Sequence, residues 1–341
     1  MDLGNNVVQF PAQAEPEYEG IELERAKKMF RESEEVHQVA RDLSFRDRDF
    51  YDNFDDGQWS EEEKAELRRR GQPVVTSNRV KRKVNFLRGF EQRTRSDPKA
   101  LPRNPQDEQA ADVATDVLDF IDTKTRFDHI ASQCFFNLCI EGVEAAEVIV
   151  EGEDVRIKKL DYARFFFDPR SSEPDFSDAR YLGYGEWLDI DDAIDMFPDH
   201  EEILRNSVNT SEILDQGYED KPYGYWGDRD RERVRIVCLY FKRGSSDWHY
   251  VYFTGAGKLA EGLSAYLDED GRPACAIIAA SLYTSRENQR FGVVRDMIAP
   301  QKEVNSRRSL ALDMMRNRRL WQARNGVFES EAKAKAQMAK S

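Results

Sequence analysis

The sequence predicts an α+β fold in which helices come first, antiparallel strands follow, and a basic helix lies near the end. Up to residue 141 the apolar residues recur at helical spacing, whereas from residue 143 onward they follow the period of strands. Residues 286–324 contain ten Arg and Lys against four Asp and Glu, a net charge of +6, although the whole chain carries −14. The chain therefore combines an acidic α+β body with a basic helix.

The beginning of the chain predicts a flexible arm followed by a long helix. Residues 1–20 contain two prolines, several acidic residues and no periodicity, which is typical of a mobile N-terminal arm. Residues 21–50 carry apolar residues at helical spacing with charged residues between them. They predict a long amphipathic helix.

A short helix is expected after an acidic, turn-rich loop. Ser60 and Glu63 have the spacing of a capping box, which favours a helix over residues 61–70. Gly71 can adopt the left-handed conformation that ends a helix, and Pro73 prevents its continuation.

Three further helices follow this one. Asn78 can cap a helix over residues 79–96, whose outer faces are rich in Arg and Lys. A solvated or acid-paired face and a nucleic-acid patch are both open interpretations of these charges. Helices are also expected over residues 107–122 and 126–141, the second of them buried, with His129 as a packed core residue.

The second half of the body predicts an antiparallel sheet with a hairpin at its start. A short helix at 191–196 and an irregular loop or insertion at 200–231 interrupt the strands, and Gly255–Gly257 is expected to form a turn. Strands are expected at residues 143–150, 155–160, 164–168, 179–188, 233–243, 248–254 and 276–284.

The basic helix is expected to run from about residue 300 to 320. Pro300 suits the first turn of a helix, where its missing N–H has no partner to lose. Val304, Ala311 and Met315 form only a narrow apolar stripe. We expect this helix to pack along copies of itself or to line a polar space, and a solvated surface helix is the alternative.

The composition favours a protein that folds in a cytosol-like environment. Four isolated cysteines lie among apolar neighbours, which predicts free thiols rather than disulfides. No apolar run approaches the about 18 residues of a membrane span, and the first residues do not resemble a secretory signal. We therefore expect no contact with a membrane.

Motifs for catalysis or cofactor binding are missing from the sequence. It contains no Walker loop, no H-E-x-x-H or paired C-x-x-C, and no G-x-S-x-G. Acidic clusters without the spacing of an EF-hand occur at Asp52, Asp55 and Asp56 and at Asp189, Asp191, Asp192 and Asp195. We expect no catalytic residue, cofactor or metal, and interpret the clusters as solvated loops or helix starts.

Three blocks of sequence stand out by their order and spacing. The first comprises residues 49–60, 70–73, 78–80 and 89–93, the second 168–169 with 177–181, and the third 292–296 with 300–308. Together they resemble the portal proteins of tailed double-stranded DNA bacteriophages of the short-tailed type. The resemblance marks the following residues as structural: Gly57, Trp59, Gly71, Pro73, Asn78, Asp168, Pro169, Gly292, Asp296, Pro300, Gln301 and Asn305.

The resemblance implies a ring-forming subunit with the phage portal fold. Twelve copies would surround a channel at one capsid vertex, through which a separate terminase pumps DNA in and from which the DNA later leaves. The α+β wing body would span residues 51–285 and the stem helices 286–320, followed at 321–341 by the start of a clip or a truncated tail.

The resemblance also implies where the protein acts and with what. The expected partners are further copies of the chain, non-specific double-stranded DNA, terminase, the major capsid and scaffolding proteins, and a tail or head-completion adaptor. The expected location is the portal vertex of the virion, after assembly in the cytoplasm of a bacterial host.

Basic residues near the end of the chain are the candidates for the channel wall or the subunit interface. Strong phosphate contacts would stall sliding DNA, so we expect these residues to divide between intersubunit ion pairs and the channel wall. The candidates are Arg295, Lys302, Arg307, Arg308, Arg316, Arg318 and Arg319.

Two other classes of function remain open. A DNA-binding regulatory or nucleoid-type protein would use the basic helix Arg79–Arg95, and salt-dependent binding of the monomer to duplex DNA would favour it. A metal-dependent nuclease or other hydrolase would use the acidic clusters. Metal-stimulated DNA cleavage that Asp191→Ala abolishes would favour this class.

Overall fold

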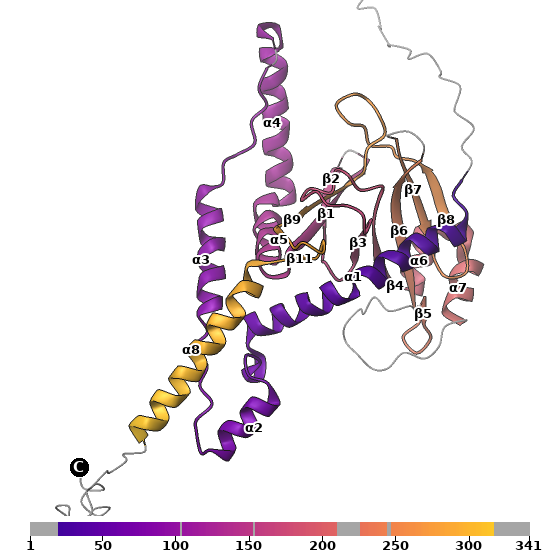
Figure 1. Cartoon of the computed structure of the whole chain (residues 1–341). Coiled ribbons are helices and arrows are strands. Elements are labelled where there is room, and N and C mark those ends of the chain that lie inside the picture. Colours follow the sequence, from indigo (N-terminus) through magenta and orange to yellow (C-terminus); the bar gives the residue numbers. More distant parts are fainter. Residues whose placement is uncertain (1–19, 103, 153, 210–225, 244–246, 317–341) are drawn as a thin grey trace, which may run out of the picture. The chain divides into compact units, whose positions relative to one another are not determined.

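The chain forms two compact units, described by a computed structural model (Figure 1). The sheet unit comprises Met1–Val39 and Glu144–Ala280, and the helix unit comprises Ala40–Val143 and Ser281–Ser341. Helix α1 (Leu23–Asp52) continues from the first unit into the second. The structure describes residues 20–102, 104–152, 154–209, 226–243 and 247–316.

A six-stranded antiparallel sheet forms the centre of the sheet unit, as the sequence predicts. Its order is β3-β4-β6-β7-β8, and β5 also pairs with β6. The Gly255–Gly257 turn is confirmed, since the Thr254 N–H donates to the Gly257 carbonyl over 2.9 Å. The strands are β3 (Phe165–Phe167), β4 (Tyr181–Asp189), β5 (Gly227–Asp228), β6 (Arg233–Lys242), β7 (Trp248–Phe253) and β8 (Lys258–Leu263).

One face of this sheet is covered by the first turns of α1 (Figure 1). Alternate side chains of a strand point to opposite faces, so Val237 and Leu239 of β6 share this side. Phe30 of α1 meets Phe166 of β3 edge to face, with ring centroids 4.9 Å apart. The amphipathic helix predicted at residues 21–50 is therefore confirmed.

Helices α6 (Ile190–Met196) and α7 (Glu201–Asn209) pack with the other side chains of β6. Val234 and Ile236 join Leu204 of α7 in one apolar cluster. The irregular loop predicted at 200–231 was therefore wrong over its first third, because burial of Leu204 and its neighbours stabilises a short helix. Strand β8 was also missed, since Glu261 and Gly262 lower its strand propensity.

A second sheet of three strands has the order β2-β1-β9. Strands β1 (Val143–Glu151) and β2 (Asp154–Leu160) form the predicted antiparallel hairpin, and β9 (Ile277–Ser281) pairs with β1. The single strand predicted at 276–284 is divided, because Tyr283–Thr284 (β10) pairs instead with Arg290–Phe291 (β11).

Five helices and the second half of α1 form most of the described helix unit. The predicted capping box is present, with the Ser60 hydroxyl accepting from the Glu63 N–H and the Glu63 carboxylate from the Ser60 N–H. Asn78 caps α3, since its side chain accepts from the Lys81 N–H over 2.9 Å. The five are α2 (Glu61–Arg69), α3 (Arg79–Thr94), α4 (Glu108–Thr125), α5 (Phe127–Glu141) and α8 (Val293–Arg316).

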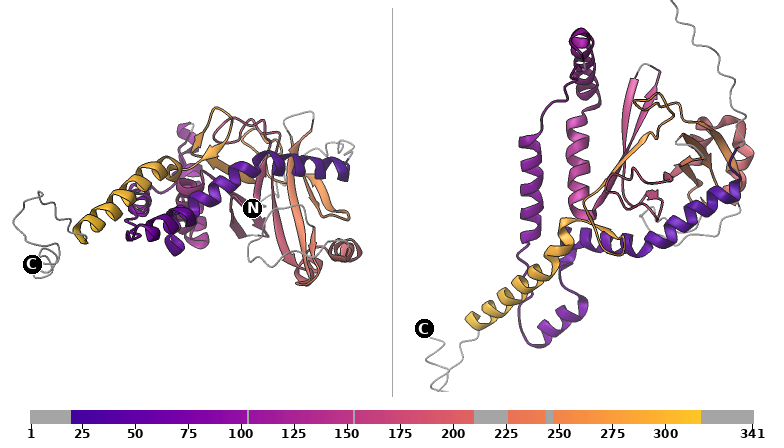
Figure 2. Two further views of the ribbon diagram at one scale, coloured as in Figure 1. Left: turned by 60° about the horizontal axis from the view of Figure 1, so that its bottom comes forward. Right: turned by 45° about the horizontal axis from the view of Figure 1, so that its top comes forward.

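The core of the helix unit lies where α3, α5 and α8 meet. Helices α3 and α5 run side by side (Figure 2), and Val84 and Ile140 are fully buried in the same cluster as Val294. The prediction that His129 is a core residue was wrong, because it lies in the exposed first turn of α5.

Helix α8 begins seven residues before Pro300, so the prediction that Pro300 lies in the first turn was wrong. A proline inside a helix loses one hydrogen bond. Here the preceding turns are fixed by packing, because Val294, Met297 and Ile298 belong to the core of the helix unit. Tertiary burial outweighs the local preference of proline.

All four cysteines are free thiols, as predicted. Burial raises the pKa of Cys139 to about 11. Among the described residues, no helix is both long and apolar enough to cross a membrane.

Candidate functional site

A row of buried polar side chains runs along one face of α8. Gln301, Asn305, Ser309 and Asp313 are between 0% and 7% exposed. They recur at every fourth position, which places them on one side of the helix. The helix therefore packs on a polar face rather than on the apolar stripe that the sequence predicts, and Met315 of that stripe is 68% exposed.

The extended segment between α2 and α3 runs beside this face of α8 (Figure 1) and donates to it. The Arg79 N–H donates to the Gln301 side chain over 3.0 Å, and the Ser77 N–H to Asn305 over 3.0 Å. The Val75 N–H donates to the Ser309 hydroxyl over 3.2 Å. We name these helix side chains and residues 72–79 the polar seam.

The spacing of the polar seam follows from the geometry of its two sides. Four residues of a helix advance about 6 Å, and two residues of an extended chain advance about 6.6 Å. Every fourth side chain of α8 can therefore meet every second N–H of the segment. Pro73 would be next in this series but has no N–H, and the Gln72 side chain donates to Asp313 over 3.4 Å instead.

The side-chain amides of the seam also form hydrogen bonds with one another and with nearby carbonyl groups. Gln301 Nε2 lies 2.9 Å from the Ser77 carbonyl and 2.8 Å from Asn305 Oδ1. Asn305 Nδ2 donates to Gln58 over 2.8 Å, and Gln58 Nε2 donates to the Phe50 carbonyl over 3.0 Å. Buried polar groups destabilise a fold unless they are paired, and these are paired.

Several residues of the first sequence block surround the seam. Trp59 Nε1 donates to the Thr76 hydroxyl over 3.1 Å, and Asn78 Nδ2 to the Tyr51 carbonyl over 2.9 Å. Gly71 has the left-handed φ of 71° that ends α2, and Gly57 ends the 3-10 turn Phe54–Asp56. The block therefore positions the segment that α8 binds.

The start of the third block lies where α8 meets α5. A side chain at Gly292 would place its Cβ 2.5 Å from the carbonyl oxygens of Cys139 and Ile140, so only glycine fits. Asp296 is exposed in the first turn of α8, where a negative charge favours the helix dipole.

Three of the predicted basic residues form ion pairs within the subunit. Arg295 pairs with the fully buried carboxylate of Asp47 over 2.8 Å, and Lys302 with Glu63 of α2 over 3.4 Å. Arg307 pairs with Glu303 one turn earlier on the exposed side of α8.

The structure describes only two of the four remaining candidates. Arg308 and Arg316 are exposed and form no ion pair with the described residues. Arg318 and Arg319 lie outside the described residues.

The second block forms a turn in the sheet unit. Asp168 accepts from Arg180 Nε over 2.5 Å and Nη2 over 3.0 Å, and Pro169 follows it at the first corner of the turn that leads to Ser171. Asp178 accepts from Ser171 and Ser172. Burial would raise the pKa of Asp178, but these hydrogen bonds outweigh it and lower the pKa to about 2.

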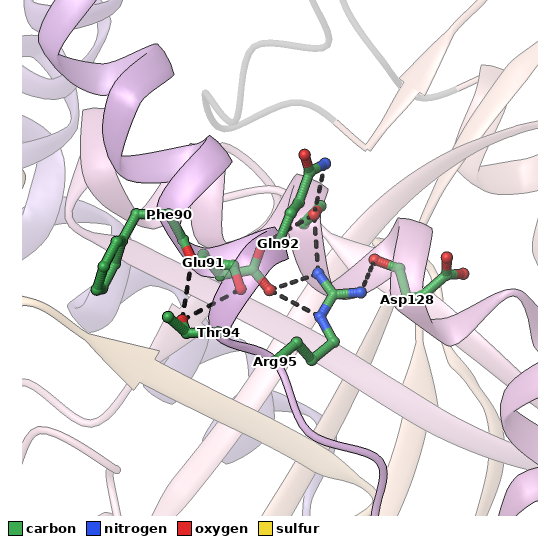
Figure 3. A network of polar contacts seen from close by, with 7 residues as sticks. Phe90, Glu91, Gln92, Thr94, Arg95 and Asp128 are labelled. Carbon is green, nitrogen blue, oxygen red and sulfur yellow. Dashed lines mark hydrogen bonds and ion pairs between the residues drawn. The ribbon is translucent and has the colours of Figure 1, made fainter.

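The C-terminal end of α3 is tied to α5 by a network around Arg95 (Figure 3). The Arg95 guanidinium pairs with Glu91 and donates to the Ser132 hydroxyl over 2.8 Å and to the Asp128 carbonyl over 2.5 Å. Arg95, at the end of the predicted basic helix Arg79–Arg95, therefore forms its contacts within the helix unit.

Sequence reasoning missed Ser309, Asp313 and Gln58 as members of the seam. The signal was the four-residue spacing of polar side chains that begins at Gln301. It was overlooked because a search for an apolar stripe assumes that the buried face of a helix is apolar.

Among the described residues, no group of three or more His, Cys, Asp or Glu side chains is arranged to hold a metal ion. A protein-family model described as phage P22-like portal protein matches residues 27–247 and 241–341. No curated protein matches the chain.

Proposed function

The chain belongs to the phage P22-like portal protein family, and on this basis we propose that it forms a homododecameric ring at one vertex of a bacteriophage capsid. The ring is the conduit through which double-stranded DNA enters during packaging and leaves during ejection. The match to the family over most of the chain carries the proposal. The portal family is a structural one, and the role we assign needs no catalytic residue.

We assign the wall of the channel to the stem region 286–320, in which α8 is the described helix. At about 1.5 Å per residue, its 24 residues extend about 36 Å. The seam holds one face of α8 inside the subunit, and the opposite face carries Arg307, Leu310 and Met314, all exposed. This free face supports a role toward neighbouring copies or the channel.

The charges of α8 support a wall that guides DNA without binding it tightly. Each phosphate that a cation neutralises adds affinity by releasing counterions. Ion pairs within the subunit reduce this attraction at Arg295, Lys302 and Arg307. Arg308 and Arg316 are the described candidates that remain for phosphates or for acidic groups of a neighbouring copy.

The other partners follow from the same role. We propose that the ring docks terminase during packaging and a tail or head-completion adaptor afterwards, and that it contacts the major capsid and scaffolding proteins. Residues 321–341, which lie outside the described residues, would form the start of the clip.

Native mass spectrometry of the purified protein, followed by negative-stain imaging, tests the proposal. We expect rings of about twelve subunits, the closed symmetry that repeated identical contacts allow. A stable monomer that binds duplex DNA tightly, with a strong dependence on salt, would contradict it. That result would favour a DNA-binding regulator that uses α3.

The double variant Arg307→Glu/Arg308→Glu tests the assignment of α8. We expect a marked loss of assembled rings or of packaged DNA, because the reversal places like charges where the proposal expects acidic neighbours or phosphates. Arg25→Glu/Lys28→Glu on α1 makes the same change in charge at two exposed positions and is the matched control. Normal rings and full heads in the double variant would exclude this role.

A further inference from the structure

Helix α4 exposes an apolar row beside an acidic row. Val113, Val117 and Phe120 are 62%, 50% and 62% exposed. Asp112 and its two equivalents, Asp116 and Asp119, precede them by one residue each, so the two rows run side by side along the helix. All three carboxylates are exposed, and no ion pair joins them to a described residue.

The opposite side of α4 is already covered. Ala111 is 8% exposed, and the Ala100 N–H donates to the Thr115 hydroxyl over 3.1 Å, which fixes the loop between α3 and α4 there. The helix extends beyond the C-terminal end of α3 (Figure 1). Its apolar row is therefore not the inner face of the helix unit.

Helix α3 exposes a row of the opposite charge. Phe86 and Phe90 are 63% and 57% exposed, and their rings stack with centroids 6.5 Å apart. The helical period places three exposed cations, Arg82, Lys83 and Arg93, on the same face. Lys83 Nζ lies 5.5 Å from the centre of the Phe86 ring, and none of the three forms an ion pair with a described residue.

The two faces match in both chemistry and charge. Helix α3 carries six Arg and Lys against one Glu, whereas α4 carries five Asp and Glu against one Lys. Exposed apolar patches bordered by charge mark interaction sites, and charge complementarity selects the partner. No described residue covers either face. Each face carries exposed apolar side chains beside charges opposite to those of the other face.

We propose that α4 of one copy docks on α3 of the next copy around the ring. The proposal rests on the proposed ring function and names the contact that builds it. Two different surfaces of one chain that bind each other form a head-to-tail contact, which closes into a ring when the rotation allows. Duplex DNA could occupy the cationic face of α3, but it would leave the acidic face of α4 unexplained.

A charge exchange tests this contact in the full chain. Arg82→Glu/Lys83→Glu and, separately, Asp116→Lys/Asp119→Lys should each raise the protein concentration at half-assembly about tenfold or more, because like charges then meet. Combining all four substitutions restores opposite charges and should recover most of the rings. Arg25→Glu/Lys28→Glu on the exposed side of α1 is the control of equal charge change and should leave assembly unchanged.

The apolar part of the contact has its own test. Val117→Gln/Phe120→Gln should weaken assembly without changing the net charge. The control Val36→Gln/Val39→Gln replaces two valines of α1 that are 57% and 58% exposed, and it should leave assembly unchanged. Because all these positions are exposed, we expect each variant to fold like the wild type. Circular dichroism and unfolding curves check this.

Cross-linking between copies identifies the pairing directly. A short bismaleimide should link Val117→Cys protein to Phe86→Cys protein in a mixture, above the background of the native cysteines and of either protein alone.

Three outcomes separate the proposals. If wild-type protein stays a monomer that binds duplex DNA tightly and Val117→Cys protein does not cross-link to Phe86→Cys protein, both the ring function and this contact are wrong. If wild-type rings form and both reversed pairs assemble normally, or the fourfold variant is not restored, the contact is wrong while the ring function stands. If Arg82→Glu/Lys83→Glu removes duplex DNA binding and leaves rings intact, α3 binds nucleic acid instead.

Discussion

The sheet unit and the helix unit bury different chemistry along their central elements. In β6, residues Val234 to Phe241 are all at most 4% exposed, and apart from Arg235 they are apolar, aromatic or thiol side chains. In α8, every buried residue after Val294 is polar. Apolar contact is non-directional, whereas hydrogen bonds require particular distances and angles. Lost volume should therefore damage the sheet unit most, and lost polar atoms should damage the seam most.

Phe166→Ala tests the sheet unit and should have the largest effect. Phe166 is fully buried between sheet and α1, so its loss removes apolar contact and leaves a cavity. We expect a loss of about 3–5 kcal/mol in the free energy of unfolding, measured by urea denaturation. Phe166→Leu, which keeps most of the volume, should cost clearly less. Similar small losses for both would mean that packing does not hold this unit.

Asn305→Ala tests the seam and should cost about 2–3 kcal/mol, because it leaves the Ser77 N–H and the Gln58 side-chain oxygen without their partner. Asn305→Leu keeps the volume and should cost as much. Hydrogen exchange should be faster at the amides of Val75, Ser77 and Arg79 in both variants. Leu310→Ala, 44% exposed on the same helix, is the control and should change neither quantity.

The contrast between the units explains how far the sequence could predict the fold. Strand periodicity located most strands of the sheet unit, because their burial on a sheet leaves a period that the sequence displays. Capping chemistry located α2 and α3 for a similar reason, since Ser60 and Asn78 act on their own neighbours. Elements that depend on neighbouring residues can therefore be predicted from the local sequence.

The seam depends on residues more than 200 positions apart, and no local signal carries such pairing. Gln301 and Arg79 meet only because the segment and α8 are brought together by the core. The resemblance to a family pointed to Gln301 and Asn305 but gave no reason for them, and Ser309 and Asp313 lay beyond its blocks. The start of α8 was likewise fixed by Val294 in the core rather than by Pro300.

Asp178→Asn tests the polar turn of the sheet unit, where the expected effect is smaller. The pKa of Asp178 is lowered to about 2, so its ionised form stabilises the fold above its usual pKa of about 4 and this contribution disappears as pH falls toward 2. At pH 7 the variant should lose about 1 kcal/mol, since solvent screens a largely exposed carboxylate. Unfolding curves at several pH values should bring wild type and variant together between about pH 4 and 2. A constant difference would mean that the charge is not the cause.

Lys302→Ala should have the smallest effect, because its ion pair with Glu63 is 44% and 41% exposed at the two side chains. Such pairs contribute up to about 1 kcal/mol, and salt weakens them. Glu63 uses one oxygen for Lys302 and the other for the Ser60 N–H that begins α2.

Comparison of two substitutions separates these roles of Glu63. Glu63→Gln can still accept from the Ser60 N–H and should match Lys302→Ala, whereas Glu63→Ala also loses the cap and should cost about 1 kcal/mol more. Urea denaturation at low and high salt distinguishes them, because only the ion-pair part should fall with salt. If Lys302→Ala instead cost as much as Asn305→Ala, this exposed ion pair would stabilise the contact of α2 with α8 as strongly as a buried hydrogen bond of the seam does.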